Sequence, residues 1–283
     1  MSVQLHQLQV ESEAGLPIRV DLRCRAEWAP LGGIVVCHGF KGFKDWGFFP
    51  HVSQRLAEAG YAVATVDFSH NGIGDQPGEF TRLDLFAQNN FSRELRDFEF
   101  VRSWLFERSP LAVDLDGKPC GVLAHSRAAL TALVAAAENP AIAAVVSWNG
   151  ISKAIRFTDR QLEQWEQDGE LEFTNARTGQ RMSIDWQFIV DCMENRERFD
   201  LAAQVKRMRA AHLILHGSED MAVDPTEAEE LRAGRGPDEG CELRIIAGGS
   251  HTFGAVHPFA GSTEQLDEAI ELSVQWFGRH LHE

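Results

Sequence analysis

Short, continuous apolar runs alternate along this sequence with segments of helical spacing, and this alternation most constrains the fold. GGIVVCHGF at 32–40 and YAVATVDF at 61–68 are almost unbroken apolar runs. Such runs are typical of strands that are buried on both faces of a sheet. Residues 48–59 and 90–108 instead place apolar side chains at helical intervals. Strands that alternate with helices predict right-handed crossovers and a mainly parallel sheet.

The rest of the chain largely continues this pattern. Two half-buried strands are expected at 3–10 and 16–25, where apolar and polar side chains alternate on either side of a turn. Further buried strands are expected at 119–126, 141–150, 213–217 and 243–249, and further helices at 128–140, 225–233 and 263–281.

Residues 150–205 break the alternation. This stretch is polar and charged, contains Trp165 and Trp186, and offers no apolar run that would make a buried strand. We therefore predict an α/β core formed by residues 1–149 and 206–283, with residues 150–205 inserted as a lid or cap.

Composition and charge exclude several classes of protein. A chain of 283 residues, 44% of them hydrophobic, can bury a large core. Its net charge of −15 repels nucleic acids and anionic lipids, so we expect neither a nucleic-acid nor a membrane partner. Five cysteines without CxxC spacing argue against a zinc site and a disulfide framework. The first 15 residues are polar and carry no signal-peptide pattern, so we expect a cytoplasmic location.

Residues with catalytic chemistry follow three of the predicted strands. Ser126 ends the strand at 119–126, Asp220 follows the strand at 213–217, and His251 follows the strand at 243–249. Ligands of open α/β sheets bind outside the carboxyl ends of the strands, so these three side chains are expected at one edge of the sheet.

This order of serine, aspartate and histidine, with the HGFKGFKDWGFFP stretch at 38–50, resembles the α/β-hydrolase superfamily. Within it, the chain is similar to dienelactone-hydrolase-like and acyl-peptidase-like esterases. The resemblance covers nearly the whole chain outside the insertion and implies an α/β-hydrolase fold, a mainly parallel twisted sheet flanked by helices. The family's G-x-S-x-G turn is represented by Ala124 and Ala128 around Ser126, which keep the small side chains that the turn requires.

The resemblance implies a role for each of the three residues. Ser126 is the expected nucleophile, His251 the general base, and Asp220 the acid that orients the histidine. His257 lies six residues beyond His251 in the same loop and is the alternative base.

Other neighbours of these residues have competing interpretations. Asp224 and Glu219 are alternatives to Asp220, but Asp224 precedes Pro225 in the position of a helix N-cap. His125 adjoins the serine, and its side chain is expected to point away from that of Ser126.

Two backbone N–H groups, those of Phe40 and Arg127, are expected to form an oxyanion hole. The first follows the His-Gly pair after a buried strand, and the second follows the nucleophile. Because the backbone donates there, the side chains of these two residues are not decisive, and His38 is expected to support the loop. No GxGxxG or GxxxxGK[ST] motif follows a strand, and neither a metal nor an organic cofactor is expected.

Three tryptophans are candidates for the substrate pocket. Trp148 ends the strand before the insertion, and Trp165 and Trp186 lie within it. Each could contact an acyl group, and each has the alternative of packing in a core.

We therefore expect a serine hydrolase that cleaves a carboxylic ester, or a thioester, of a small-molecule acyl substrate through an acyl-enzyme intermediate. An acyl-peptide-type serine peptidase and an acyl transferase are alternatives that would use the same site. A non-catalytic binding protein of the same fold is a third, which the presence of all three candidate residues argues against.

Overall fold

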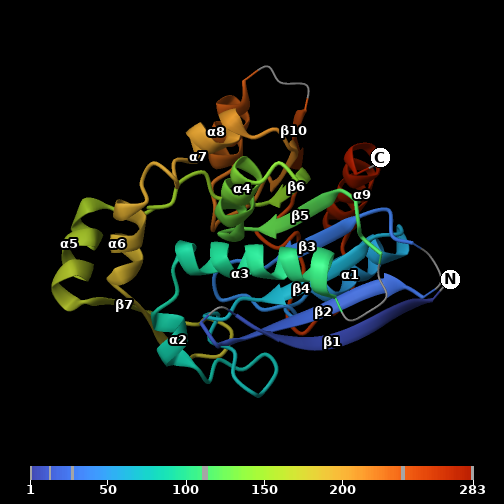
Figure 1. Ribbon diagram of the computed structural model, residues 1–283. Coiled ribbons are helices and arrows are strands. Elements are labelled where there is room, and N and C mark those ends of the chain that lie inside the picture. The colour runs from blue at the N-terminus through green and yellow to red at the C-terminus, as the bar shows by residue number, and fades with distance from the viewer. Residues whose placement is uncertain (1, 13, 27–28, 110–113, 237–239, 282–283) are drawn as a thin grey trace.

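A mainly parallel sheet runs through the centre of the computed structural model, which describes residues 2–12, 14–26, 29–109, 114–236 and 240–281 (Figure 1). Its strands are β1 (Val3–Glu11), β2 (Pro17–Arg25), β3 (Gly33–Cys37), β4 (Ala62–Asp67), β5 (Cys120–His125), β6 (Ile142–Trp148), β9 (Ala211–Gly217) and β10 (Cys241–Ile246). Across the described residues they pair in the order β1-β2-β4-β3-β5-β6-β9-β10. β2 pairs antiparallel with β1 and with β4, and all later pairs are parallel. The predicted mainly parallel sheet is confirmed.

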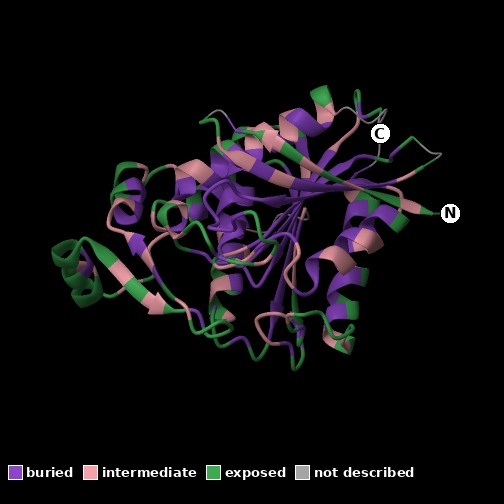
Figure 2. Ribbon diagram, turned by 90° about the horizontal axis from the view of Figure 1, so that it is seen from below, coloured by how far each residue is buried: buried purple, intermediate pink, exposed green. Residues whose placement is uncertain are grey.

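Helices cover both faces of this sheet. On one face lie α1 (Phe49–Glu58) and α9 (Glu264–His280), and on the other α3 (Phe91–Ser103), α4 (Ala128–Glu138), α7 (Leu201–Arg207) and α8 (Thr226–Arg235). Neighbouring residues of a strand point to opposite faces. Val35 therefore packs in the hydrophobic cluster under α3 and α4, while Val36 packs in the cluster under α1 and α9. Figure 2 shows the buried residues gathered along the strands and the inner sides of the helices. None of the helices in the described ranges is both long and apolar enough to cross a membrane.

The first two strands differ from the half-buried pair that the alternation predicts. β1 is largely exposed, as befits an edge strand, whereas β2 is buried on both faces. Asp21 and Arg23 on β2 are 1% and 6% exposed. Their charges are compensated by each other at 3.3 Å and by Lys44, whose Nζ lies 2.9 Å from Asp21 Oδ1. Because these charges are paired, β2 is buried on both faces, although its charged residues predict that one face is exposed.

Most of the segment 150–205 leaves the sheet beyond the ends of the parallel strands and forms the lobe at the left of Figure 1, whereas its last residues belong to α7 and pack on the core. It contains α5 (Asp159–Asp168), β7 (Glu170–Thr174), β8 (Arg181–Asp185) and α6 (Gln187–Glu194). β7 and β8 form an antiparallel hairpin that the sequence analysis did not predict. The hairpin was missed because charged residues separate its inward side chains, among them Phe173 and Ile184, and leave no continuous apolar run.

The strand order brings two loops together at the carboxyl edge of the sheet. β3 pairs with β4 on one side and with β5 on the other, so the chain reverses its direction of progress across the sheet at β3. Such switch points leave a crevice between the loops that follow the strands. The loop after β4 carries the short helix α2 (Leu83–Ala87), which packs near β8. Because β3 and β5 are paired and parallel, the residues that follow these two strands lie side by side.

Candidate active site

Ser126 occupies the sharp turn between β5 and α4. Its φ is +57°, in the left-handed region that residues other than glycine rarely adopt. The N–H of Ser126 donates to the carbonyl of Trp148 at 2.8 Å, which ties the turn to the end of β6. Ala124 and Ala128 are fully buried on either side. Strained backbone that is held by its surroundings is characteristic of functional sites.

His251 joins the serine to an aspartate. Its Nε2 lies 3.0 Å from Ser126 Oγ, and its Nδ1 lies 2.7 Å from Asp220 Oδ2. The three residues follow β5, β9 and β10, so their proximity depends on the sheet order and not on sequence distance. The carboxylate can only accept, so Nδ1 carries a proton, and in the neutral ring Nε2 is then an acceptor that faces the hydroxyl.

Asp220 is held in place from its other side. Its Oδ1 accepts from the N–H groups of Ala222 at 2.8 Å and Val223 at 3.0 Å. Burial alone would raise the pKa of Asp220, but hydrogen bonds from two histidines, His216 and His251, and from the Val223 N–H outweigh burial and hold the pKa below its ordinary value. The carboxyl group is therefore ionised at neutral pH.

The alternatives named from the sequence lie elsewhere. Asp224 accepts from the N–H and the hydroxyl of Thr226, at 2.9 and 2.7 Å, at the start of α8. Glu219 is exposed. His257 Nδ1 accepts from the N–H of Gly47 at 3.0 Å, and its ring stacks on Trp46. The structure brings Asp220 and His251 to Ser126 and leaves these three apart from it.

Two buried residues that sequence reasoning did not assign hold the loop of His251. His125 Nε2 donates to the His251 carbonyl at 2.8 Å, and the Asn149 side-chain amide donates to the same carbonyl at 2.8 Å. Asn149 Oδ1 also accepts from the N–H of Gly217 at 2.8 Å. Burial lowers the pKa of His125 to about 3, so this ring stays neutral. The Asn-Gly pair is a turn signal, but it does not say which distant loops the amide joins.

The loop after β3 lies directly against the serine. A Cβ on Gly39 would come within 2.8 Å of Ser126 Cβ and 2.9 Å of the His125 carbonyl, so only glycine fits there. The backbone N–H groups of Phe40 and Arg127 donate to no other group in the part of the chain that the structure describes. His38 Nδ1 donates to the carbonyl of Gly39 at 2.9 Å, which agrees with a supporting role. The arrangement leaves two donors beside Ser126.

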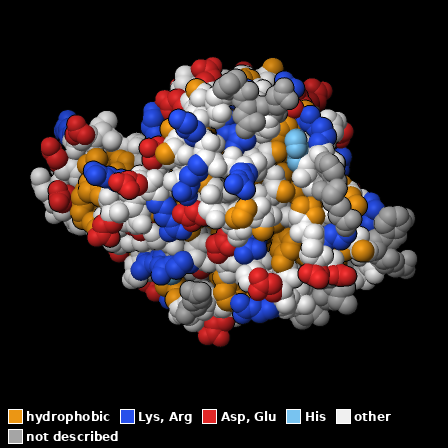
Figure 3. All heavy atoms as spheres, turned by 45° about the horizontal axis from the view of Figure 1, so that its top comes forward, with side chains coloured by type: hydrophobic (Ala, Val, Ile, Leu, Met, Phe, Trp, Pro, Cys, Tyr) orange, Lys and Arg blue, Asp and Glu red, His pale blue; other side chains and the backbone are white. Residues whose placement is uncertain are grey.

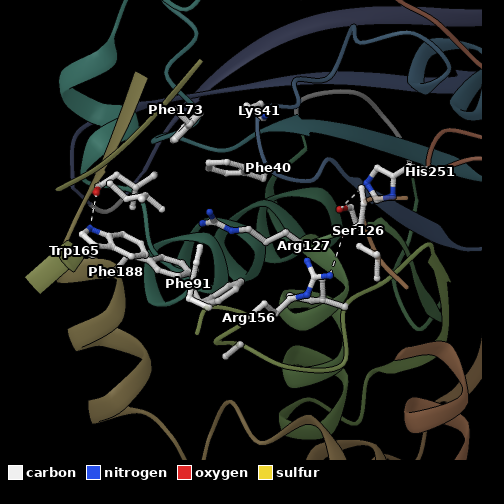
Figure 4. Close-up of a pocket in the computed structure, with 17 residues that line it drawn as sticks. Phe40, Lys41, Phe91, Ser126, Arg127, Arg156, Trp165, Phe173, Phe188 and His251 are labelled. Atoms are coloured by element: carbon white, nitrogen blue, oxygen red, sulfur yellow. Dashed lines mark hydrogen bonds between the residues drawn. The ribbon is translucent and has the colours of Figure 1, made fainter. Parts of the chain in front are cut away.

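A pocket of about 490 Å³ opens next to Ser126 and His251 (Figure 4). Its far wall comes from the segment 150–205, whose lining residues are mostly apolar: Ile151, Ala154, Phe157, Trp165, Leu171, Phe173, Ile184 and Phe188. Trp165 is fixed by an Nε1–H donation to the Ile184 carbonyl at 2.9 Å and by stacking on Phe188. Within the described residues, no group of three or more His, Cys, Asp or Glu side chains is arranged to hold a metal ion.

The other two tryptophans do not line this pocket. Trp148 lies on the opposite face of the sheet, against Phe48 and Phe253, and donates to Ser273 Oγ at 3.0 Å. The expectation that Trp148 walls the substrate site is therefore wrong, because alternation along β6 turns its side chain toward α1 and α9. Trp186 packs edge-on against Trp165 from behind the lining.

A sheet of this order, with a serine on a left-handed turn between a buried strand and a helix, is the architecture of an α/β hydrolase. A family model described as the alpha/beta hydrolase family matches residues 34–262, and the chain belongs to that family. The predicted fold class is thus confirmed. No curated protein sequence matches the chain as a relative.

Solved structures share this fold at low sequence identity. Est1E from Butyrivibrio proteoclasticus, solved with ferulic acid, is 17% identical with a TM-score of 0.70 over 96% of this chain and 98% of that one. A dienelactone hydrolase from Anabaena variabilis is 16% identical with a TM-score of 0.63 over 100% of both chains. A monoacylglycerol lipase from Paleococcus ferrophilus is 17% identical with a TM-score of 0.65 over 98% and 99%. At these sequence identities the similarity shows a shared fold.

The strained turn predicts an unusual order of stability. Because a left-handed φ costs an L-residue roughly 1–2 kcal/mol and costs glycine little, Ser126→Gly should be more stable than Ser126→Ala by about 0.5–1 kcal/mol. Urea unfolding of both variants measures the difference. Ser53 in α1 is the control, since glycine in a helix should be about 1 kcal/mol less stable than alanine. If the glycine variant is less stable than the alanine variant at both positions, the backbone at Ser126 is not strained.

Proposed function

We propose that this protein is a serine hydrolase that cleaves a carboxylic ester, or a related thioester. The observation that carries the proposal is the hydrogen-bonded chain from Ser126 through His251 to Asp220 at the edge of an apolar pocket. A serine hydroxyl is a weak nucleophile by itself and needs a base within hydrogen-bond reach. The 3.0 Å contact with Nε2 supplies that base.

The reaction follows from the positions of these groups. Ser126 Oγ attacks the carbonyl carbon while His251 Nε2 takes its proton, and Asp220 stabilises the imidazolium that forms. The N–H groups of Phe40 and Arg127 bind the negative oxygen of the tetrahedral intermediate. The bond to the leaving oxygen or sulfur then breaks, His251 returns the proton to it, and an acyl-serine remains. Water, deprotonated by the same histidine, releases the acid and restores the serine.

The apolar pocket lining and the proteins of similar fold both support an ester as the substrate. The pocket lining is mostly apolar and can bury an acyl group of moderate size. Among the proteins of similar fold, one is an esterase domain from Rhodothermus marinus and another is a monoacylglycerol lipase. A peptidase or an acyl transferase would use the same chemistry with a different leaving group or acceptor.

We also infer that the inserted segment covers the site. It supplies most of the apolar lining, including Trp165, Phe173 and Phe188. α7 (Leu201–Arg207) packs on α4 and α8, so the insertion ends before α7, near residue 200, and the core resumes there. A cover of this kind excludes water from the acyl-enzyme and shapes the space for the acyl chain.

A fluorophosphonate probe tests the nucleophile. The probe should label the wild-type protein covalently and should not label Ser126→Ala, because the attacking oxygen is absent. The same substitution should lower the turnover of p-nitrophenyl esters by about 10⁶-fold. Mass spectrometry of the labelled peptide checks the position. Labelling of the alanine variant at wild-type rate would show that the nucleophile lies elsewhere.

A matched pair of substitutions tests the acid. Asp220→Asn should lower kcat by about 10⁴-fold, because an amide favours the wrong tautomer of His251. Asp224→Ala, four residues away, should keep most of the activity and lose about 1 kcal/mol of stability, because Thr226 at the start of α8 loses its hydrogen-bond acceptor. Ester kinetics and urea unfolding of both variants check this. An inactive Asp224 variant beside an active Asp220 variant would reverse the two roles.

A second pair tests the cover. Trp165→Phe removes part of an aromatic ring from the pocket wall, so the preference among p-nitrophenyl esters should move toward longer acyl chains by about 1 kcal/mol. Trp186→Phe, behind the lining, should keep the wild-type order of preference. Values of kcat/KM across acyl lengths measure both. If both variants keep the wild-type order, the insertion does not shape the acyl site.

A further inference from the structure

The charges that line the pocket are of one sign. Lys41, Arg127 and Arg156 are lining residues, and among the described residues of the lining none is acidic. The whole chain has 42 acidic and only 27 basic residues. On the face seen in Figure 3, acidic and basic side chains are interspersed. Positive charge is thus concentrated beside Ser126, against the overall balance of the protein.

Two of the three cations have acidic partners. Arg156 lies 2.6 Å from Glu227 and also donates to the Ala222 carbonyl at 3.1 Å. Arg127 lies 2.8 Å from Glu94, and its guanidinium carbon is 5.3 Å from the centre of the Phe40 ring. Each pair compensates most of the charge of its arginine. Lys41, the third cation of the lining, differs from both arginines.

Lys41 has no acidic partner in the described parts of the chain. Its Nζ lies 5.6 Å from the ring centre of Phe40 and 5.4 Å from that of Phe173, so its surroundings are aromatic. Burial lowers the pKa of Lys41, as expected for an ammonium group without a counter-ion. Its backbone φ of +58° is again left-handed. Two aromatic rings stabilise this half-buried cation only in part, and its backbone is strained, so the arrangement is costly to stability and is typical of a ligand site.

The position of His251 decides which part of an ester would meet this cation. His251 must return a proton to the leaving group, so the leaving group lies on the histidine side of Ser126. The acyl group then extends to the other side. Figure 4 shows Phe40, Arg127 and Trp165 on that other side, with Lys41 beside Phe40.

We propose that the acyl group of the substrate carries an anion, in the simplest case a carboxylate, that Lys41 binds. The guanidinium of Arg127 packs on the same Phe40 ring, but Glu94 compensates its charge, so Lys41 is the cation that remains for the anion. The apolar wall formed by the insertion takes the carbon chain between the anion and the scissile carbonyl. The preferred substrates are thus half-esters of dicarboxylic acids. This inference rests on the proposed esterase function.

The test compares p-nitrophenyl half-esters of glutaric, adipic and suberic acid with the same compounds methylated at the free carboxyl group. Release of p-nitrophenol gives kcat/KM for each, and Ser126→Ala serves as the blank for spontaneous cyclisation. For at least one chain length the wild-type protein should prefer the free acid by about tenfold, because the ion pair forms in a partly buried pocket.

Substitutions assign that preference to Lys41. Lys41→Met should lower the ratio of free-acid to methylated kcat/KM by about tenfold, and Lys41→Arg should keep it above one. Lys41→Gln provides a second neutral variant in case the first does not fold, and thermal melting checks both. Lys206→Met removes an exposed charge from α7 and should leave the ratio unchanged.

The outcomes separate the two proposals. If the wild-type protein cleaves both kinds of ester and does not prefer the free acid, the pocket does not bind an anion, although the esterase function stands. The same conclusion follows if a folded Lys41→Met variant keeps the wild-type ratio. If the wild-type protein cleaves neither kind, the esterase function fails, and the inference fails with it.

Discussion

The candidate site depends on loops that approach one another more closely than side chains would permit. Gly39 lies against Ser126, and a Cβ on Gly217 would come within 2.1 Å of the Gly249 carbonyl. These contacts place the loops after β3, β5, β9 and β10 in direct backbone contact at one edge of the sheet. The buried amide of Asn149 then joins the end of β9 to the loop of His251. The contacts of His251 with Ser126 and Asp220 follow from this convergence, because hydrogen bonds of 3.0 and 2.7 Å require the loops that carry these residues to meet.

Buried polar groups hold the loop that contains Phe40 and Lys41. Asp67 at the end of β4 accepts from the Lys44 N–H at 2.7 Å and from the Asn71 amide at 3.0 Å. Burial raises the pKa of Asp67 to about 6, against the lowering effect of the Lys44 hydrogen bond. A buried carboxyl group is acceptable only where donors satisfy it, and here it fixes the backbone that follows Phe40 and Lys41.

The candidate reacting residues and the apolar wall of the pocket come from different parts of the chain. The hydrogen-bonded residues belong to the sheet and its loops, whereas the aromatic wall belongs to the hairpin and helices of the insertion. Trp165 is 2% exposed and is fixed by the Ile184 carbonyl, so the wall is a packed surface. When the reacting residues keep their positions and the residues of the pocket wall vary, one fold can act on many substrates. Lys41 and Arg127 also line the pocket, and they come from the loops after β3 and β5.

The sequence by itself determined the class of fold and the order of the candidate residues, because apolar runs, helical spacing and small residues around Ser126 are local signals. Only the tertiary structure decided which acid reaches His251, since Asp220 and Asp224 lie four residues apart on the same loop, and folding buries the first beside His251 and leaves the second exposed at the start of α8. It also decided that Trp148 faces away from the pocket, and that Lys41 has no counter-ion among the described residues. These properties depend on strand register and on contacts between residues far apart in the chain, and no local pattern encodes either.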